Sequence, residues 1–138
     1  MSLKTVQSLR DMYQADWQEL ASEQATWHWE GNDLRIGITY YLTQKLPEFQ
    51  YITSVRGVLL CGAEVLLLTN KDGIQHIVPG GRLDNDETLM EGLAREMLEE
   101  TGYTFTEPQL IAVIHHQHLT SKPEGYPYSS SEFLQIVY

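Results

Sequence analysis

Hydrophobic positions in the first fifty residues follow two different periods. From about Thr5 to Thr26 apolar side chains recur at steps of three and four residues: Val6, Leu9, Tyr13, Trp17, Leu20 and Ala21. This spacing predicts an amphipathic helix. After the turn residues 31–33, apolar and polar positions alternate from Leu34 to Tyr40, which predicts a strand. We therefore expect residues 1–50 to form an N-terminal extension of one helix and one strand.

The rest of the chain, residues 51–138, has short apolar runs separated by turn residues. Strands are predicted over Ile52–Cys61, Glu64–Thr69, Ile74–Val78, Gln109–His118 and Glu132–Tyr138. One helix is predicted over Leu89–Thr101, with Thr88 as N-cap, Glu91 completing a capping box and Gly102 as the stop. Strands around one helix indicate a mixed chain of the α/β (α+β) class.

Composition bounds the function. The 138 residues suit one domain, and 42% of them are hydrophobic, which is enough for a core. Lys and Arg number 9 against 19 Asp and Glu, so the formal net charge is −10. A protein that binds a nucleic-acid polymer carries clustered cations for the phosphates, so we expect no nucleic-acid polymer as partner.

The expected location rests on segments that the sequence lacks. No run of about 18 apolar residues could span a membrane, and no basic segment followed by an apolar one marks a secretory signal. Cys61 is the single cysteine and lies in the apolar run Val58–Cys61. We expect a buried thiol in a cytoplasmic protein that does not bind membranes.

Half of the net charge lies between Gly81 and Tyr103, where seven acids accompany two bases. On the predicted helix, three glutamates share an arc of about 100°: Glu96, Glu99 and Glu100. The apolar residues fall on the opposite side: Met90, Leu93, Ala94, Met97 and Leu98. Two interpretations are open, a solvated acidic face or a site for a hard divalent cation held by oxygen ligands.

A longer sequence pattern distinguishes the solvated acidic face from the cation site. Gly81 is followed by five residues, Glu87, seven residues and then Arg95-Glu96-Met97-Leu98-Glu99-Glu100-Thr101-Gly102-Tyr103. This resembles the Nudix box of the Nudix hydrolases, Gly-x5-Glu-x7-Arg-Glu-U-x-Glu-Glu-x-Gly-U, where U is a bulky aliphatic residue. All seven fixed positions match, and a chance match is on the order of 10⁻⁸ per starting point.

The departures from this pattern are small. Tyr103 replaces the last aliphatic residue, and Gly92 stands where the family usually has alanine. The glycine weakens the predicted helix by up to about 1 kcal/mol. Neither change removes a catalytic group, and residues 1–50 lie outside the resemblance.

The resemblance implies a Nudix fold, in which a mixed β-sheet is sandwiched between helices. It also implies a hydrolase that cleaves a nucleoside diphosphate linked to another group, by attack of water on phosphorus. Mg²⁺ or Mn²⁺ would be the cofactor, with ligands from Glu96, Glu99, Glu100 and the main chain of Gly81. Glu96 would also be a candidate general base, and Glu87 and Arg95 would form an ion pair that orients the cluster. Charge and motif agree, because an acidic site would repel a polyanionic substrate unless cations intervene.

Residues outside the motif are weaker candidates. Arg56 and Arg82 are predicted to contact phosphate, and Glu132 to take part in substrate binding; Glu132 and Glu124 are also alternative general bases. Each could instead be an ordinary surface residue. Four aromatic side chains could stack on a nucleobase or simply pack: Trp27, Trp29, Tyr126 and Tyr128.

Three histidines near the end of the chain suggest a metal cluster at first sight: His115, His116 and His118. Neighbouring residues of a strand point to opposite faces, so the three cannot converge on one ion. We expect them to have structural or solvent-facing roles.

Two alternatives to a hydrolase stay open. A Nudix-fold sensor would bind a nucleotide ligand without turnover, but such a protein would usually have lost part of the motif or gained a DNA-binding extension. Prenyl-diphosphate isomerisation would need a catalytic cysteine, which Cys61 is badly placed to supply.

Two apolar segments bear on the assembly of the protein. The chain ends just after the apolar segment Phe133–Val137. The domain is therefore either truncated at Tyr138 or covered there by a partner. The apolar stripe of the N-terminal helix would form core or a subunit contact, and we expect a homodimer.

Overall fold

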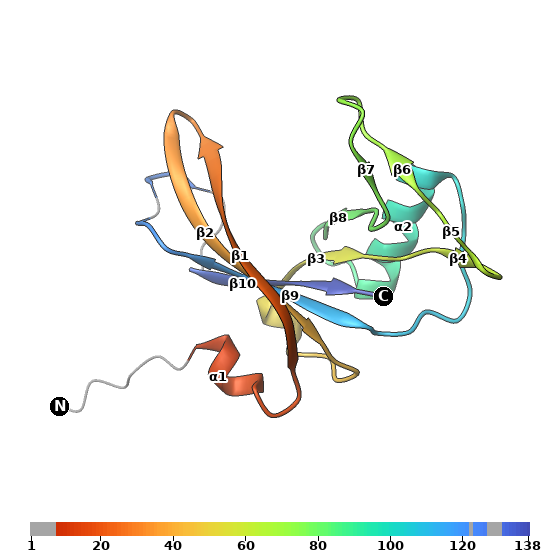
Figure 1. Cartoon of the computed structure of the whole chain (residues 1–138), viewed down its shortest axis with the longest axis horizontal. Coiled ribbons are helices and arrows are strands. Elements are labelled where there is room, and N and C mark those ends of the chain that lie inside the picture. The colour runs from red at the N-terminus through yellow and green to blue at the C-terminus, as the bar shows by residue number, and fades with distance from the viewer. Residues whose placement is uncertain (1–7, 122, 127–130) are drawn as a thin grey trace.

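The computed structural model describes residues 8–121, 123–126 and 131–138 (Figure 1). Its helical elements are α1 (Leu9–Tyr13), η1 (Phe49–Tyr51) and α2 (Leu89–Thr101). The longer strands are β1 (Gln18–Trp29), β2 (Asn32–Leu42), β3 (Ile52–Arg56), β8 (Gly80–Arg82), β9 (Ala112–His118) and β10 (Glu132–Val137). Two small hairpins complete the described elements: β4 (Leu60–Cys61) with β5 (Glu64–Val65), and β6 (Leu68–Thr69) with β7 (Gln75–His76).

One six-stranded sheet organises these elements, in the order β1-β2-β9-β10-β3-β8. Neighbouring strands are antiparallel except β10 and β3, which run parallel. Val113 belongs to one core cluster and Ile114 to another, because successive residues of a strand face opposite sides. The prediction of an α+β chain built on a mixed sheet is confirmed.

The larger core cluster joins both α-helices to one face of this sheet. The sheet contributes Tyr41, Ile52, Val55, Val113, Leu134 and Ile136. Helix α2 adds Leu89, Leu93 and Met97, and the N-terminal segment adds Leu9 and Trp17. Burial of this apolar surface is what holds α2 against β3 and β8.

The helix predicted over about residues 5–26 is wrong after Tyr13. Within its described part only Leu9–Tyr13 is α-helical, and Gln18 begins a strand that pairs antiparallel with β2. The helical spacing stops at Ala21, after which Ala25, Trp27 and Trp29 repeat every second residue and pack on the Leu34–Ile38 cluster. Pairing with β2 therefore overrides the helical pattern, and Leu20 is 55% exposed.

The strand predicted over Leu34–Tyr40 is confirmed within β2, and the last two predicted strands are confirmed as the shorter β9 and β10. The strand predicted over Ile52–Cys61 is broken after Arg56. Gly57 follows there, and a β-carbon on it would lie 3.1 Å from Met97 Cε and 3.2 Å from Leu93 Cδ1. Helix α2 therefore packs directly on the chain where it leaves the sheet.

The hairpins beyond this break also differ from the predictions. The strands predicted over Glu64–Thr69 and Ile74–Val78 are reduced to two-residue pieces. Cys61 was predicted to be buried, but it is exposed, because its strand belongs to the small β4–β5 hairpin and not to the central sheet. Among the described residues, no helix has the length and apolar character needed to cross a membrane.

Candidate active site

Helix α2 begins and ends as predicted. The Thr88 hydroxyl accepts a hydrogen bond from the Glu91 amide at 3.2 Å, and Gly102 ends the helix in the left-handed conformation at φ 75°. Its buried face is narrower than predicted, because Met90 and Leu98 are 38% and 56% exposed; Ala94 is exposed as well. Glu96, predicted on the open face, is only 8% exposed. One of the three glutamates is therefore largely withdrawn from solvent.

Arg95 is the centre of the candidate site, and one side of its guanidinium faces the loop before α2. Nε and Nη2 donate to Glu87 Oε2 and Oε1 at 2.7 and 2.9 Å, a bidentate ion pair. Nε also lies 3.2 Å from Asp84 Oδ2. Nη2 donates to the Arg82 carbonyl at 3.1 Å. We call these contacts the loop side of Arg95.

The other side of the guanidinium faces the helix. The single atom Nη1 donates to Glu96 Oε1 at 3.0 Å and to Glu99 Oε2 at 3.2 Å. The carboxylates of Glu96 and Glu99 therefore share one nitrogen donor and lie close together. We call these contacts the helix side of Arg95.

This environment fixes the charge states of the pair. The hydrogen bond from Arg95, assisted by an amide hydrogen bond from Asp84, lowers the pKa of Glu87 to about 2. The surrounding carboxylates, Glu87 first, raise the pKa of Arg95 above its ordinary value. Both groups are ionised at neutral pH, as the predicted orienting pair requires.

Two glycines of β8 allow the glutamates to approach the backbone. A β-carbon on Gly81 would lie 2.6 to 2.8 Å from the atoms of the Glu96 carboxylate. Gly80 has φ 153°, and its amide donates to Glu100 Oε2 at 2.8 Å. Glycine at position 81 leaves room for Glu96, and glycine at position 80 leaves room for the β3 backbone at Val55 and Arg56.

A third glycine explains one departure from the family pattern. A β-carbon on Gly92 would collide with Leu83 Cδ2 and lie 2.9 Å from Glu87 Oε1. The space that an alanine would fill is thus occupied by the loop residue Leu83 and by the carboxylate that binds Arg95. An alanine at position 92 would require these two side chains to move.

The donor set fits a hard divalent cation such as Mg²⁺ or Mn²⁺. Glu96, Glu99 and Glu100 offer only carboxylate oxygens, and the Gly81 backbone lies beside Glu96. As the side chains stand, no three His, Cys, Asp or Glu groups in the described part of the chain are placed to hold an ion. Glu96 and Glu99 would have to exchange Arg95 Nη1 for the ion, and Glu99 is 59% exposed, which leaves room to move.

The arginines predicted to contact phosphate lie next to this cluster. Arg56 pairs with Gly80 across β3 and β8, and its guanidinium donates to Gln135 Oε1 at 2.9 Å and to the Val78 carbonyl at 3.1 Å. Arg82 ends β8 and gives its carbonyl to Arg95. Both therefore flank the backbone that receives the glutamates.

Glu132 lies elsewhere. It begins β10, whose far end pairs with Arg56 through Val137. Its carboxylate lies 3.0 Å from His115 Nε2 and accepts the Leu9 amide at 3.4 Å. The structure thus connects Glu132 to α1 and to β9. Glu124 is exposed on the loop before β10.

The predicted histidine and aromatic candidates have packing contacts. His116 stacks on Phe133 with ring centroids 4.7 Å apart, and Trp27 packs against His116 at 5.7 Å. Tyr126 lies edge-on to Trp29 at 5.4 Å and to His118 at 5.0 Å. Tyr128 lies outside the described residues. All three histidines are buried.

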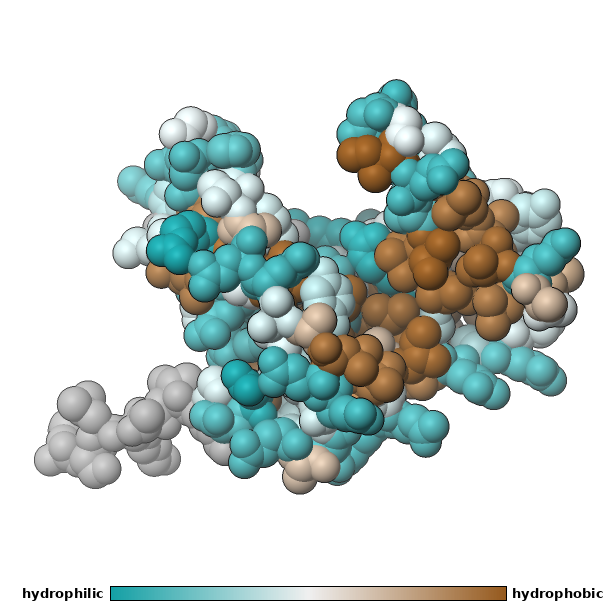
Figure 2. Space-filling model, in the orientation of Figure 1, coloured by the Kyte–Doolittle hydropathy of each residue, from teal (hydrophilic) through white to brown (hydrophobic). Residues whose placement is uncertain are grey.

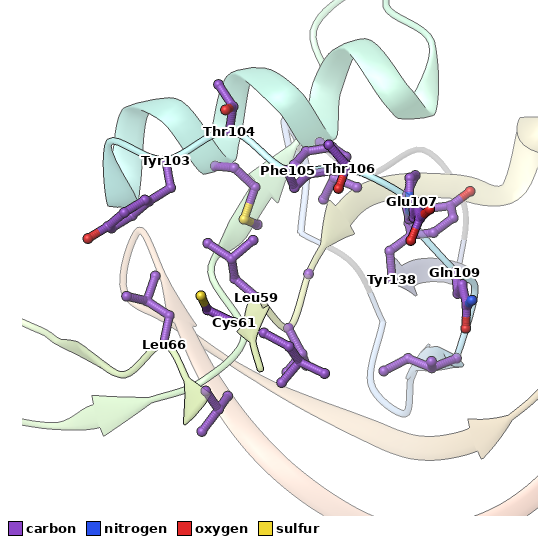
Figure 3. Close-up of a pocket in the computed structure, with 18 of the residues that line it drawn as sticks. Leu59, Cys61, Leu66, Tyr103, Thr104, Phe105, Thr106, Glu107, Gln109 and Tyr138 are labelled. Atoms are coloured by element: carbon purple, nitrogen blue, oxygen red, sulfur yellow. The ribbon is translucent and has the colours of Figure 1, made fainter. Parts of the chain in front are cut away.

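A cavity of about 740 Å³ opens beside α2 (Figure 3). Leu93 and Met97 line it from the helix, and the β4–β5 hairpin and residues 103–109 complete it. Its walls are mainly apolar and include no Lys or Arg and none of the three candidate metal ligands. A diphosphate would find no counter-charge there, so we place the candidate active site at β8 and not in this cavity.

Sequence reasoning missed Asp84. Its Oδ2 shares the Nε of Arg95 with Glu87, although the motif leaves position 84 unspecified. Its place three residues before Glu87, in the same acidic segment, is the signal that could have found it. The loop turns back there through a hydrogen bond from the Glu87 amide to the Asp84 carbonyl at 3.3 Å.

Comparison with known families agrees with this geometry. The model of the NUDIX domain matches residues 51–138, well over half of the chain. The chain therefore belongs to the NUDIX family, and the resemblance of its motif is confirmed. A search of curated proteins gives no match. Membership supports a hydrolase of the Nudix superfamily, whose members generally use divalent metal ions and act on small nucleotide derivatives.

Proposed function

We propose that this protein is a divalent-cation-dependent pyrophosphohydrolase. Its substrate would be a nucleoside diphosphate linked to another group. The observation that carries the proposal is the arrangement around Arg95, where Glu96 and Glu99 adjoin and Glu96 lies against Gly81. Glu100, held by the Gly80 amide, completes a set of oxygen donors at one backbone turn.

Glu96, Glu99, Glu100 and the Gly81 carbonyl would hold Mg²⁺ or Mn²⁺. When bound, the ion supplies charge neutralisation at the diphosphate oxygens and lowers the pKa of water. The loop side of Arg95 keeps Glu87 and Arg95 fixed while the acids of the helix side change partners. Arg56 and Arg82 lie on the paired strands β3 and β8, and their guanidinium groups would form ion pairs with the phosphates of the substrate.

The reaction is a displacement at phosphorus. A water oxygen forms a bond to one phosphorus as the bridging anhydride P–O bond breaks, and the second phosphate leaves with the bond's electrons. The proton lost by the water would go to a carboxylate, and Glu96 is our candidate because it is buried against Gly81, where the ion would be held. Glu132 was a further candidate for substrate binding, but its contacts with His115 and Leu9 favour an anchoring role.

The test is phosphate-coupled turnover with Mg²⁺ or Mn²⁺ across a panel of nucleoside diphosphate derivatives. We expect at least one substrate to be cleaved, and Glu100→Gln to lower its turnover by at least about tenfold. Glu91→Gln is the matched control, because Glu91 is an exposed glutamate of the same helix outside the cluster. Equal turnover in Glu100→Gln and the parent would overturn the ligand assignment.

A second candidate, the nucleotide sensor, is separated by the same panel. It predicts tight nucleotide binding with no cleavage of any substrate. The complete acid set favours the hydrolase, because a sensor needs no water-activating carboxylates.

Assembly and location stay proposals. We propose a cytoplasmic homodimer, with residues 1–50 as an extension of the Nudix domain. Leu9 and Trp17 of the predicted stripe are already buried in the protomer's own core, so they belong to the core. Light scattering on the purified protein would give the oligomeric state, and a monomer would overturn the dimer.

A further inference from the structure

Arg95 is shared unequally between the two groups of acids. On its loop side, Nε and Nη2 make all the contacts with Glu87, Asp84 and the Arg82 carbonyl. On its helix side, Nη1 alone holds Glu96 and Glu99. Release of Glu96 and Glu99 therefore costs Arg95 the contacts of one nitrogen and leaves the rest of the guanidinium in place.

The negative charge on the loop side also exceeds the positive charge of Arg95. Glu87 and Asp84 together present two carboxylates to one cation, so they more than neutralise it. A neutralised guanidinium holds Glu96 and Glu99 less tightly and repels an incoming cation less. With Glu87 alone, more of the positive charge would remain available to the helix side.

From this arrangement we infer that Asp84 is a positioning residue that draws Arg95 to the loop side and so releases Glu96 and Glu99 for a divalent cation. The inference rests on the proposed function, in which those two glutamates are metal ligands. It adds a residue that the Nudix motif leaves unspecified.

Hydrogen bonds to Glu87 hold the backbone of Asp84 in place. The Asp84 amide donates to Glu87 Oε1 at 3.0 Å, and its carbonyl accepts the Glu87 amide at 3.3 Å. Asp86, between them, has the left-handed φ of 63° that closes the turn. The backbone of Asp84 is thus fixed beside the same carboxylate that binds Arg95.

The effect is limited by solvent. The Asp84 side chain is 70% exposed, so its attraction for Arg95 is screened. We expect Asp84→Asn to raise the dissociation constant for Mn²⁺ about two- to fivefold, the range in which an exposed ion pair acts.

The experiment is a Mn²⁺ titration of the full chain followed by electron paramagnetic resonance, which needs no substrate. Asp86→Asn is the matched control, since it removes the same charge from the same loop and Asp86 forms no hydrogen bond or ion pair within the described residues. We expect Asp84→Asn to weaken Mn²⁺ binding more than Asp86→Asn does. Asp84→Glu should restore binding toward the parent value, and the thermal unfolding midpoints should agree among the variants.

The outcomes separate the two proposals. A parent protein that binds Mn²⁺, together with equal dissociation constants for Asp84→Asn and Asp86→Asn, would overturn the role of Asp84 alone. A parent protein that binds no Mn²⁺ would overturn the proposed function and this inference together. The concentration of Mg²⁺ that gives half-maximal turnover should rise in Asp84→Asn by the same factor as the Mn²⁺ constant.

Discussion

Gly81 faces the carboxylate of Glu96 so closely that a β-carbon at position 81 would lie 2.6 Å from Glu96 Oε1. The same oxygen also accepts a hydrogen bond from Arg95 Nη1 at 3.0 Å. The carboxylate is therefore in contact with both the β8 backbone and the Arg95 guanidinium. This contact joins the strand β8 to the helix α2 at the point where the proposed chemistry occurs.

Gly81→Ala should therefore displace Glu96 and lower metal-dependent turnover by at least about tenfold. Gly37→Ala is the control, because a β-carbon there would meet Leu119 at an ordinary 3.7 Å. Turnover and Mn²⁺ binding should both fall in the first variant and remain at the parent level in the second. Parent-like turnover in Gly81→Ala would show that the Glu96 carboxylate does not need its observed position.

The motif region was the part of the fold best predicted from the sequence. Helix α2 has its predicted bounds because the cap at Thr88 and the stop at Gly102 are local signals that the fold does not override. The pairing of Glu87 with Arg95 was inferred from the family resemblance, and the structure shows it. The spacing of the three glutamates along one helix also carries over directly, because it depends only on helical geometry.

The predictions from the sequence were wrong where tertiary contacts determine the secondary structure or the burial of a residue. The segment before Trp29 matches a helical period for part of its length, and only its partner β2 makes it a strand. The burial of Glu96 depends on Gly81, which a helical projection does not contain. The exposure of Cys61 depends on a hairpin that leaves the central sheet.

The pairing of Glu87 with Arg95 predicts a defined pH dependence of stability. The pKa of Glu87 falls from 4.5 to about 2 on folding, so its contribution is complete above about pH 4.5 and is lost as the pH falls toward 2. Urea unfolding should show Glu87→Gln less stable than the parent at pH 7, with the difference shrinking below pH 4.5. Glu91 has no such pair among the described residues, so Glu91→Gln should show no comparable convergence. A difference that is constant from pH 7 to pH 3 would contradict the assigned pair.

The buried His116 should lower the stability of the fold in a pH range above that of Glu87. Burial, with the positive charge of nearby Arg56 and the neighbouring histidines, lowers the pKa of His116 from 6.5 to about 4. Between these two pH values the histidine binds a proton in the unfolded chain but not in the folded chain, so stability falls as the pH drops from 6.5 toward 4. The loss from this group should be up to about 3 kcal/mol.

His116→Phe checks this assignment, because phenylalanine can keep the stacking on Phe133 and cannot titrate. Its stability should change less between pH 6.5 and pH 4 than that of the parent, as measured by urea unfolding. His76→Gln is the control, since His76 Nε2 lies 3.1 Å from the side-chain amide oxygen of Asn70, a neutral partner at an exposed site. Equal slopes in His116→Phe and the parent would exclude His116 as the titrating group.

Glu132 connects the start of the chain to the sheet. Both of its carboxylate oxygens receive the Leu9 amide at 3.4 Å, and one lies 3.0 Å from His115 Nε2. Leu9 is itself 3% exposed in the larger core, so this polar contact accompanies burial of α1. Glu132→Gln should weaken the anchor by about 1 to 3 kcal/mol, and it should speed trypsin cleavage after Arg10 in the loosened α1. Glu64→Gln, at an exposed position of β5, should change neither quantity. Reduced turnover in Glu132→Gln, with parent-like unfolding and cleavage, would contradict the anchor and restore Glu132 as a substrate-binding residue.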